Sequence, residues 1–504
     1  MRVAVLTLAL VVTVLVCCPV PASSQPAPAG APATAGATDT PAARGEPRVE
    51  GWLSNVTRVE SWRFFAPPSP EVDPNYTFAG NRMDLGLRTR GARIDLSGAF
   101  RYVRLERLPT DAIGPGPLGT GPIYYAATGL PYSYQVFVTD LSVAWHTRDR
   151  RVRVAAGRLS YTSGAEGDAD GPRVPSHLAE VRALAVDGRT MGTFDWSLYQ
   201  RRFDGVRADW NGARAYAGGG FFLPSQGGFE ESANLTIPRI QVGTTWMGWR
   251  HAGGQAESQA SAQWYRDRRE IDIRPDNALL PIDRADVTVW SMGASHVRTR
   301  ALGDGEADVA VWGAVQGGDW YGEAHRAWSA TVQGGFEWSS APWRPWARGG
   351  WSYASGDEAA RDGRHQTWFP MLGETRPFAL SMVYAPMNLR DVFAQVHVRP
   401  HARARARVDL HLLDLAQASD RWYQGSGATA REGRFFGFTT RPANGQRALG
   451  TILEGTADVR LSRYWSINGY LGRMWGGPVV RTSFVGDRLL SWYVENVLEL
   501  RVGK

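Results

Sequence analysis

The mature form of this chain is expected to contain no cysteine. Both cysteines, Cys17 and Cys18, fall in an N-terminal segment with the order of a secretory signal peptide: an apolar run over residues 3–16, two prolines and then small residues. Cleavage after the last of these would remove residues 1–24. The alternative, a lipoprotein signal, is disfavoured because Val16 is not a small residue. An exported chain without cysteine has no disulfide, no cysteine metal site and no thiol nucleophile.

A second long apolar run is also missing. After the expected signal peptide, no stretch approaches the roughly 18 uninterrupted apolar residues that a membrane-spanning helix requires. Residues 25–50 consist mostly of Pro, Ala, Gly and Thr and predict a flexible leader, because this composition buries too little apolar surface to fold. Residues 51–504 are long enough for several soluble domains or for one large barrel, so a membrane location would require strands.

Lysine is almost absent. Lys504 is the only lysine among 56 basic residues, and the formal net charge is +7. A GC-rich genome would explain this bias without any function, whereas binding of carboxylate or phosphate groups would use the planar fork of the guanidinium group. The positions of the arginines along the chain, and not their number, distinguish these explanations.

Glycine and large aromatic residues are abundant, with 57 Gly, 21 Trp and 17 Tyr. Trp and Tyr at this level suit strands that cross two membrane-water interfaces, where amphipathic rings collect. In residues 401–413, Arg403, Arg405 and Arg407 alternate with apolar residues at a period of two, which is typical of a strand. The apolar side of this strand could face a soluble core or lipid, and its arginines would then face bulk water or a wet lumen.

Eighteen segments have the length of tilted membrane strands. They cover residues 52–65, 81–89, 92–107, 135–147, 151–160, 203–210, 213–223, 239–250, 255–266, 288–298, 308–317, 327–338, 343–353, 391–399, 402–413, 450–459, 464–475 and 489–501. Long and short connections alternate between them, except around residues 299–326. Outer-membrane barrels alternate in this way because tight turns lie at the periplasmic end and long loops at the other. We therefore predict an all-β fold, a single transmembrane antiparallel β-barrel of 18 strands, in the bacterial outer membrane.

On several strands, charged residues alternate with apolar residues and define a face toward the lumen. This alternation places the following residues along the expected substrate pathway: Arg82, Asp84, Arg88, Arg93, Asp95, Arg101, Arg403, Arg405 and Arg407. The alternative is that these arginines are wall residues paired with neighbouring carboxylates. Beyond Tyr102 the charges change parity at Arg104 and Glu106, which either a bulge or the edge of the membrane would explain.

Several motifs resemble the alginate-export family of outer-membrane barrels. They are AGRL at residues 156–159, GTFDWSLYQRRFDGVR at residues 192–207, SGD at residues 355–357, TWFP at residues 367–370 and a closing series from residue 449 to residue 499. The resemblance implies an 18-stranded barrel with a narrow, electropositive lumen, gated by external loops and a long periplasmic turn. The matching motif adds Arg158 and Arg207 to the expected pathway, whereas the structural alternative for Arg207 is an ion pair with Asp204 or Asp209.

The leading hypothesis from the sequence is a passive, electrostatically guided channel for anionic polysaccharide of the alginate type or for related acidic solutes. Its expected partners are outer-membrane lipid, the solute and periplasmic export proteins. The alternatives are a general or substrate-specific porin for small anions, and a non-conducting barrel that serves as an adhesin or anchor.

Catalytic and metal-binding motifs do not stand out. HExxH, GxSxG and P-loop patterns are absent, and the acidic residues 166–171 lack the spacing of an EF-hand. His397 and His401 are four residues apart but straddle a predicted turn, so the spacing does not direct both rings to one metal ion. We expect no enzyme activity, no cofactor, no metal ligand set and no nucleic-acid partner.

Overall fold

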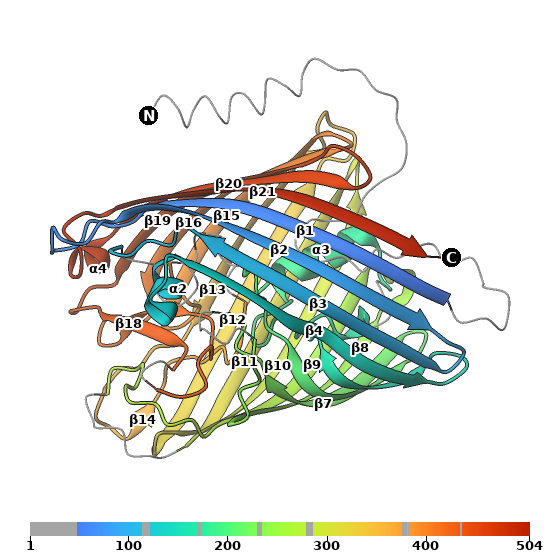
Figure 1. The fold of residues 1–504 in the computed structure, drawn as a ribbon, viewed down its shortest axis with the longest axis horizontal. Coiled ribbons are helices and arrows are strands. Elements are labelled where there is room, and N and C mark those ends of the chain that lie inside the picture. Colours follow the sequence, from blue (N-terminus) through green and yellow to red (C-terminus); the bar gives the residue numbers. More distant parts are fainter. Residues whose placement is uncertain are drawn as a thin grey trace.

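The computed structural model describes most of the chain: residues 48–112, 121–168, 173–228, 234–278, 286–374, 381, 383–433 and 436–503. The expected signal peptide and nearly all of the expected leader lie outside the described residues. One sheet closes on itself to form a barrel (Figure 1). This sheet includes the two-residue strand β14 (Arg364–His365), which adds in parallel to one end of β12, so that the barrel wall itself has eighteen strands.

The wall strands are antiparallel and follow one another around the barrel in chain order. Their bounds are β1 (Arg48–Arg63), β2 (Asn75–Arg90), β3 (Ile94–Glu106), β4 (Tyr132–His146), β5 (Val152–Leu159), β6 (Phe203–Asn211), β7 (Ala215–Pro224), β8 (Ile240–Arg250), β9 (Ala256–Asp267), β10 (Val287–Leu302), β11 (Gly305–Trp320), β12 (Glu323–Glu337), β13 (Trp346–Ala354), β15 (Leu389–His401), β16 (Ala404–Leu415), β19 (Ala448–Arg460), β20 (Trp465–Gly476) and β21 (Arg488–Gly503). The pairing of β21 with β1 closes the barrel.

The predicted architecture is confirmed, with one wall strand in each of the eighteen predicted segments. The first strand starts slightly earlier than expected. Arg48 already pairs with Arg90 of β2, so the wall begins inside the segment that was predicted as leader.

The outer surface of the wall carries the apolar side of the strands. On β16, Val408, Leu410 and Leu412 are exposed, whereas Asp409 and His411 between them are buried toward the interior. Exposed aromatic side chains gather near both ends of the strands. Toward the end with the short turns lie Trp145, Trp210, Trp249, Trp338, Trp343, Tyr464 and Trp465, and toward the other end lie Tyr132, Tyr134, Phe221, Trp290, Trp328 and Trp475. Two such girdles are typical of a membrane-spanning barrel.

The parity change predicted beyond Tyr102 is explained by the edge of the membrane. Val103 and Leu105 stay buried on the inner face of β3, while Arg104 and Glu106 are exposed on the outer face and form an ion pair. The strand therefore keeps its phase and extends past the apolar band.

Short and long connections alternate as predicted, except between β10 and β13. Strands β10 and β11 are joined by residues 303–304, and β11 and β12 by residues 321–322, so one short turn also lies at the external end. Tyr321 and Gly322 have φ angles of 54° and 88°. This left-handed pair forms a tight two-residue hairpin, which lets both strands continue beyond the positions expected from the sequence.

Several long connections fold into the barrel. The long connections contain helices α2 (Gly121–Thr128), α3 (Ser176–Ala185) and α4 (Pro478–Arg481), the 3₁₀ helix η1 (Glu166–Asp168), and a hairpin of β17 (Arg421–Gly425) and β18 (Phe438–Pro442). A second 3₁₀ helix, η2 (Ala252–Gly254), lies in the short turn between β8 and β9. Phe194, Trp368 and Phe369 from these connections are fully or almost fully buried. Among the described residues, no helix is both long enough and apolar enough to cross a membrane.

The inner wall is also held by buried ion pairs. Arg348 of β13 lies 2.9 Å from Asp308 of β11, and both side chains are fully buried. The Trp346 indole N–H donates a second hydrogen bond to Asp308 at 2.7 Å. Hydrogen bonds of this kind offset the desolvation of both charges, so that loss of one partner would leave the other charge buried and unpaired.

Candidate transport pathway

Helix α3 lies inside the barrel and packs against β10 and β11 (Figure 1). Leu178, Val181 and Ala185 recur at helical spacing on one side of α3, and all three are buried. Pro175 precedes the first turn, where its missing N–H costs no helical hydrogen bond. The helix therefore attaches to the inner wall by an apolar stripe.

A buried ion network fixes the same helix. The Arg182 guanidinium donates to Glu257 of β9 at 2.8 Å and to Asp168 of η1, and it lies 3.4 Å from Asp187. Burial raises the pKa of Asp187 to about 7, although Arg182 acts in the opposite direction. α3 is thus tied to the wall by charge as well as by apolar contact.

Glu180 of α3 extends to two arginines of the inner wall. Arg399 of β15 lies 3.1 Å from one Glu180 oxygen, and Arg405 of β16 lies 3.7 Å from the other. The side chains of the two arginines are 24% and 25% exposed and that of Glu180 is 16% exposed. Arg399 also lies 3.5 Å from Glu337. Two neighbouring strands thus present guanidinium groups, partly open to solvent, to one carboxylate.

The predicted arginine series on β16 is only partly in the wall. Arg407 pairs with Asp409 on the same strand. The turn, predicted at residues 400–401, lies at residues 402–403, because β15 continues through a register shift to His401. Arg403 is therefore an exposed turn residue at the periplasmic end and not a residue of the lumen face.

The predicted residues in the middle of β2 and β3 form a buried group. Arg101 and Asp84 pair at 2.5 Å, and Arg82 lies 3.4 Å from Asp84. Arg101 also donates to the Tyr199 carbonyl and to the Gln200 side chain, both at 2.8 Å. Arg101 therefore joins the wall to an inner connection, while Arg82 remains partly exposed.

Three further predicted residues lie toward the periplasmic end. The Arg88 guanidinium stacks over the Trp52 ring, 5.8 Å from its centroid. Arg93 is exposed in the turn between β2 and β3, although we predicted it within the strand that follows this turn. Asp95 accepts a hydrogen bond from Arg150 at 3.2 Å and serves to fasten two neighbouring turns.

The two motif arginines both have partners. Arg158 pairs with Asp204 at 2.7 Å, and its side chain is 17% exposed. Arg207 pairs with Asp209 at 2.7 Å and donates to the Glu166 carbonyl at 3.0 Å. Of the two partners considered for Arg207, Asp209 is the one it contacts.

One buried carboxylate lies where two inner connections meet. Glu374 accepts a hydrogen bond from the Phe194 backbone N–H. Burial and the nearby Asp195 raise the pKa of Glu374 to about 8. The protonated form of this side chain is therefore favoured in the folded chain at neutral pH.

The family model described as alginate export matches residues 182–483, which is more than half of the chain. This chain belongs to the alginate-export family. The match begins within α3 and includes the wall from β6 to β20, so it contains Arg207, Arg399, Arg405 and Arg407. None of the curated proteins compared with the sequence matches it.

Solved structures of outer-membrane channels have the same fold as this alginate-export barrel. Acinetobacter baumannii OccAB4 is 8% identical, with 90% of this chain and 98% of that chain covered and a TM-score of 0.55. Pseudomonas aeruginosa OccK2 (OpdF) is 10% identical over 90% of this chain and 98% of that chain, with a TM-score of 0.54. OccK2 in complex with glucuronate gives 9% identity, the same coverage and a TM-score of 0.54.

The family and the fold together identify the molecule as a channel-forming β-barrel of the bacterial outer membrane.

Sequence reasoning missed Glu180 and Arg399. Arg399 continues the inward face of β15 and could have been found from its alternation, but Glu180 lies in a segment predicted as loop. Among the described residues, one group could hold a metal ion: Asp409, His411 and Glu454. Its members become neighbours only through the pairing of β16 with β19.

Proposed function

We propose that this barrel passes anionic polysaccharide of the alginate type, or related acidic solutes, by passive diffusion guided by arginines of the inner wall. The observation that carries the proposal is the carboxylate of Glu180 between Arg399 and Arg405. A solute carboxylate has the same chemistry as the Glu180 side chain and could take its place between the two guanidinium groups.

The exposure of the arginine side chains distinguishes those that could contact a solute from those that stabilise the wall. Arg101 and Arg207 are buried and have several hydrogen-bond partners, so replacing these by solute contacts would be costly. Arg82, Arg158 and Arg405 are partly exposed. Ion pairs at partly solvated positions are worth about 1 kcal/mol or less, which favours the rapid exchange that transport requires.

A substrate-specific porin for small acidic solutes is the second candidate. It is supported by the fold shared with OccK2, which has been solved in complex with glucuronate. The family description supports the polymer instead. Both candidates involve a carboxylate-bearing solute, so both use the same arginines and differ in the length of the solute.

Planar-bilayer recordings test the proposal. Under a KCl gradient the reversal potential should indicate anion selectivity, and glucuronate or oligouronates should reduce the current. Arg399→Ser with Arg405→Ser should weaken both effects. Arg403→Ser is the matched control, because this arginine belongs to the same series but lies in the turn. Cation selectivity, or a current insensitive to both the solutes and the double substitution, would refute the proposal.

Block by oligouronates at concentrations where the monomer has no effect would favour polymer transport. Equal block by monomer and oligomer at the same uronate concentration would favour the small-solute porin. A folded barrel that conducts no ions would instead support a role as adhesin or anchor.

A further inference from the structure

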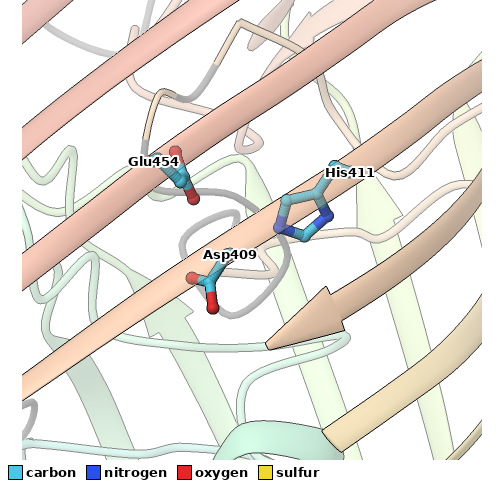
Figure 2. A group of neighbouring side chains, drawn as sticks. All are labelled: Asp409, His411 and Glu454. Atoms are coloured by element: carbon cyan, nitrogen blue, oxygen red, sulfur yellow. The ribbon is translucent and has the colours of Figure 1, made fainter. Parts of the chain in front are cut away.

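A buried polar cluster in the wall is formed by Asp409 and His411 of β16 and Glu454 of β19 (Figure 2). Asp409 is directly opposite Glu454 in the antiparallel register, and His411 follows on the same face of β16. One potential ligand atom from each residue lies within 4.8 Å of the other two. The side chains are almost fully buried, with relative exposures of 0% for Asp409, 1% for His411 and 2% for Glu454.

Carboxylates outnumber arginines among the described residues of the cluster. Like charges directly opposite one another destabilise a strand pair, and Asp409 and Glu454 are such a pair. Asp391 of β15 adds a third carboxylate beside His411. Two arginines compensate part of this negative charge: Arg407 pairs with Asp409, and Arg189 interacts electrostatically with Asp391. Among the described residues, and with a neutral His411, carboxylates thus outnumber arginines three to two in a buried place, where uncompensated charge is costly.

Two buried atoms of the cluster lack hydrogen-bond partners among the described residues. The His411 Nδ1 atom lies 3.0 Å from Asp391 Oδ2, so a neutral ring donates from Nδ1 to this carboxylate. The Nε2 atom of His411 then carries a free lone pair, and it has no partner. Asp409 Oδ1 also has none. Leaving such an atom unsatisfied in a buried place destabilises the folded chain.

A histidine that donates one ring N–H to a carboxylate and keeps the other nitrogen free is arranged as metal-binding histidines are. Glu454 is oriented as well: its Oε2 atom accepts hydrogen bonds from the Ser381 backbone N–H at 3.1 Å and from the Tyr470 hydroxyl at 3.2 Å. Both the imidazole and the carboxylates are thus held by neighbouring groups before any ligand binds.

We propose that Asp409, His411 and Glu454 bind a divalent transition-metal cation, with Zn²⁺ as the representative ion. One imidazole nitrogen and two carboxylates form a ligand set that suits Zn²⁺ better than Ca²⁺ or Mg²⁺, which prefer oxygen ligands. Asp391 acts as the positioning residue for His411. The ion would balance the excess negative charge and cross-link β16 to β19, independently of any solute that passes through the lumen.

The experiment uses the barrel without a histidine tag, refolded in detergent with Zn²⁺ or with EDTA, then dialysed and measured for metal content by mass spectrometry. We expect about one Zn²⁺ per chain after refolding with Zn²⁺. Asp409→Asn keeps the side-chain shape and should lower the affinity at least tenfold, as should His411→Ala. Asp391→Asn should lower it by about 10- to 100-fold, as expected for loss of an orienting carboxylate.

His251 and His296 provide the matched control. Ser258 bridges their side chains, with contacts of 3.0 and 2.8 Å, outside the proposed site. This histidine pair serves as the control for adventitious binding of Zn²⁺ to imidazole groups. The double variant His251→Ala with His296→Ala should keep the bound Zn²⁺.

Electrophoretic heat modifiability reports whether each variant folds. If His411→Ala fails to fold, the loss of bound Zn²⁺ in Asp409→Asn tests the proposal instead. The absorption bands of Co²⁺ substituted for Zn²⁺ then report the ligand set. Absence of bound Zn²⁺ would overturn the proposal, and it would leave a protonated His411 as the balancing charge. Zn²⁺ lost in the His251 and His296 variant but kept in Asp409→Asn would overturn it too, as would binding of Ca²⁺ in preference to Zn²⁺.

Discussion

Replacing Glu180 by Gln should increase the affinity of the channel for acidic solutes. In the folded chain the Glu180 carboxylate occupies Arg399 and Arg405, at 3.1 and 3.7 Å, and so competes with any solute carboxylate for them. Glutamine keeps the size of the side chain and removes its charge. The substitution therefore removes the charge that competes for both guanidinium groups, with little change in packing.

The size of the effect follows from the exposure of the three side chains. Partly solvated ion pairs contribute about 0.2–1 kcal/mol each. We take about 1 kcal/mol for the two contacts together, which lies below the upper limit for two such pairs. The smaller value is chosen because Arg399 keeps its contact with Glu337. A difference of about 1 kcal/mol corresponds to roughly a fivefold change in an equilibrium constant. Half-maximal block by glucuronate should therefore occur at roughly one fifth of the concentration needed for the unmodified channel.

Titration of single-channel current with glucuronate measures this change. The gain should shrink in 1 M KCl, where charges in water are screened over about 3 Å. It should also vanish when Arg399 and Arg405 are already replaced by Ser, since coupling between contacting residues is removed with either partner. Glu71→Gln, at an exposed position, is the control. An unchanged or weaker block in Glu180→Gln would refute the view that Glu180 occupies a solute site.

Three further outcomes follow from the structure. Asp308→Ala should lower the free energy of unfolding by about 3–5 kcal/mol, because it leaves Arg348 buried and unpaired, and urea titration of the barrel in micelles measures this loss. Gly322→Ala, at a φ of 88°, should cost about 1 kcal/mol in the same titration, whereas Gly98→Ala should cost less. An added Cβ meets nothing within 4 Å at either position, so the difference comes from the left-handed backbone of Gly322. The raised pKa of Glu374, about 8, means that the folded chain binds more protons than the unfolded chain between the ordinary pKa near 4.5 and pH 8. Stability should therefore fall as the pH rises through this range, and Glu374→Gln should remove that part of the pH dependence in thermal unfolding followed by circular dichroism.

The wall was predictable because each strand has a period of two and must reach from one interface to the other. Val408, Leu410 and Leu412 are apolar because they face outward, and this alternation is visible in the sequence. The turn before β16 was misplaced for a physical reason. Pro400 suggested a turn, but proline is tolerated near strand ends and at irregular pairings, so β15 continues past it to His401.

The pathway was less predictable, because alternation gives the face of a residue and not its partner. The inward side of Arg405 followed from the sequence, but its contact with Glu180 depends on how α3 folds back into the barrel. The hydrogen bond from Arg101 to Gln200 likewise depends on how the connection that contains Gln200 folds into the barrel. Such contacts join segments far apart in the chain, and no local pattern specifies them.

The near absence of lysine has a structural explanation besides base composition. Arg201 is fully buried, and its guanidinium donates to the carbonyls of Leu372, Ser426 and Ala428, at 3.2, 3.4 and 2.6 Å. A planar group with five N–H donors can bridge carbonyls from two connections at once, whereas a lysine ammonium is a compact charge with three donors and a stronger hydration shell. Arginine therefore suits an interior built from inward-folded connections. The arginines that we propose as contacts for a solute are the smaller set that such contacts leave partly exposed, and Arg405 is one of them.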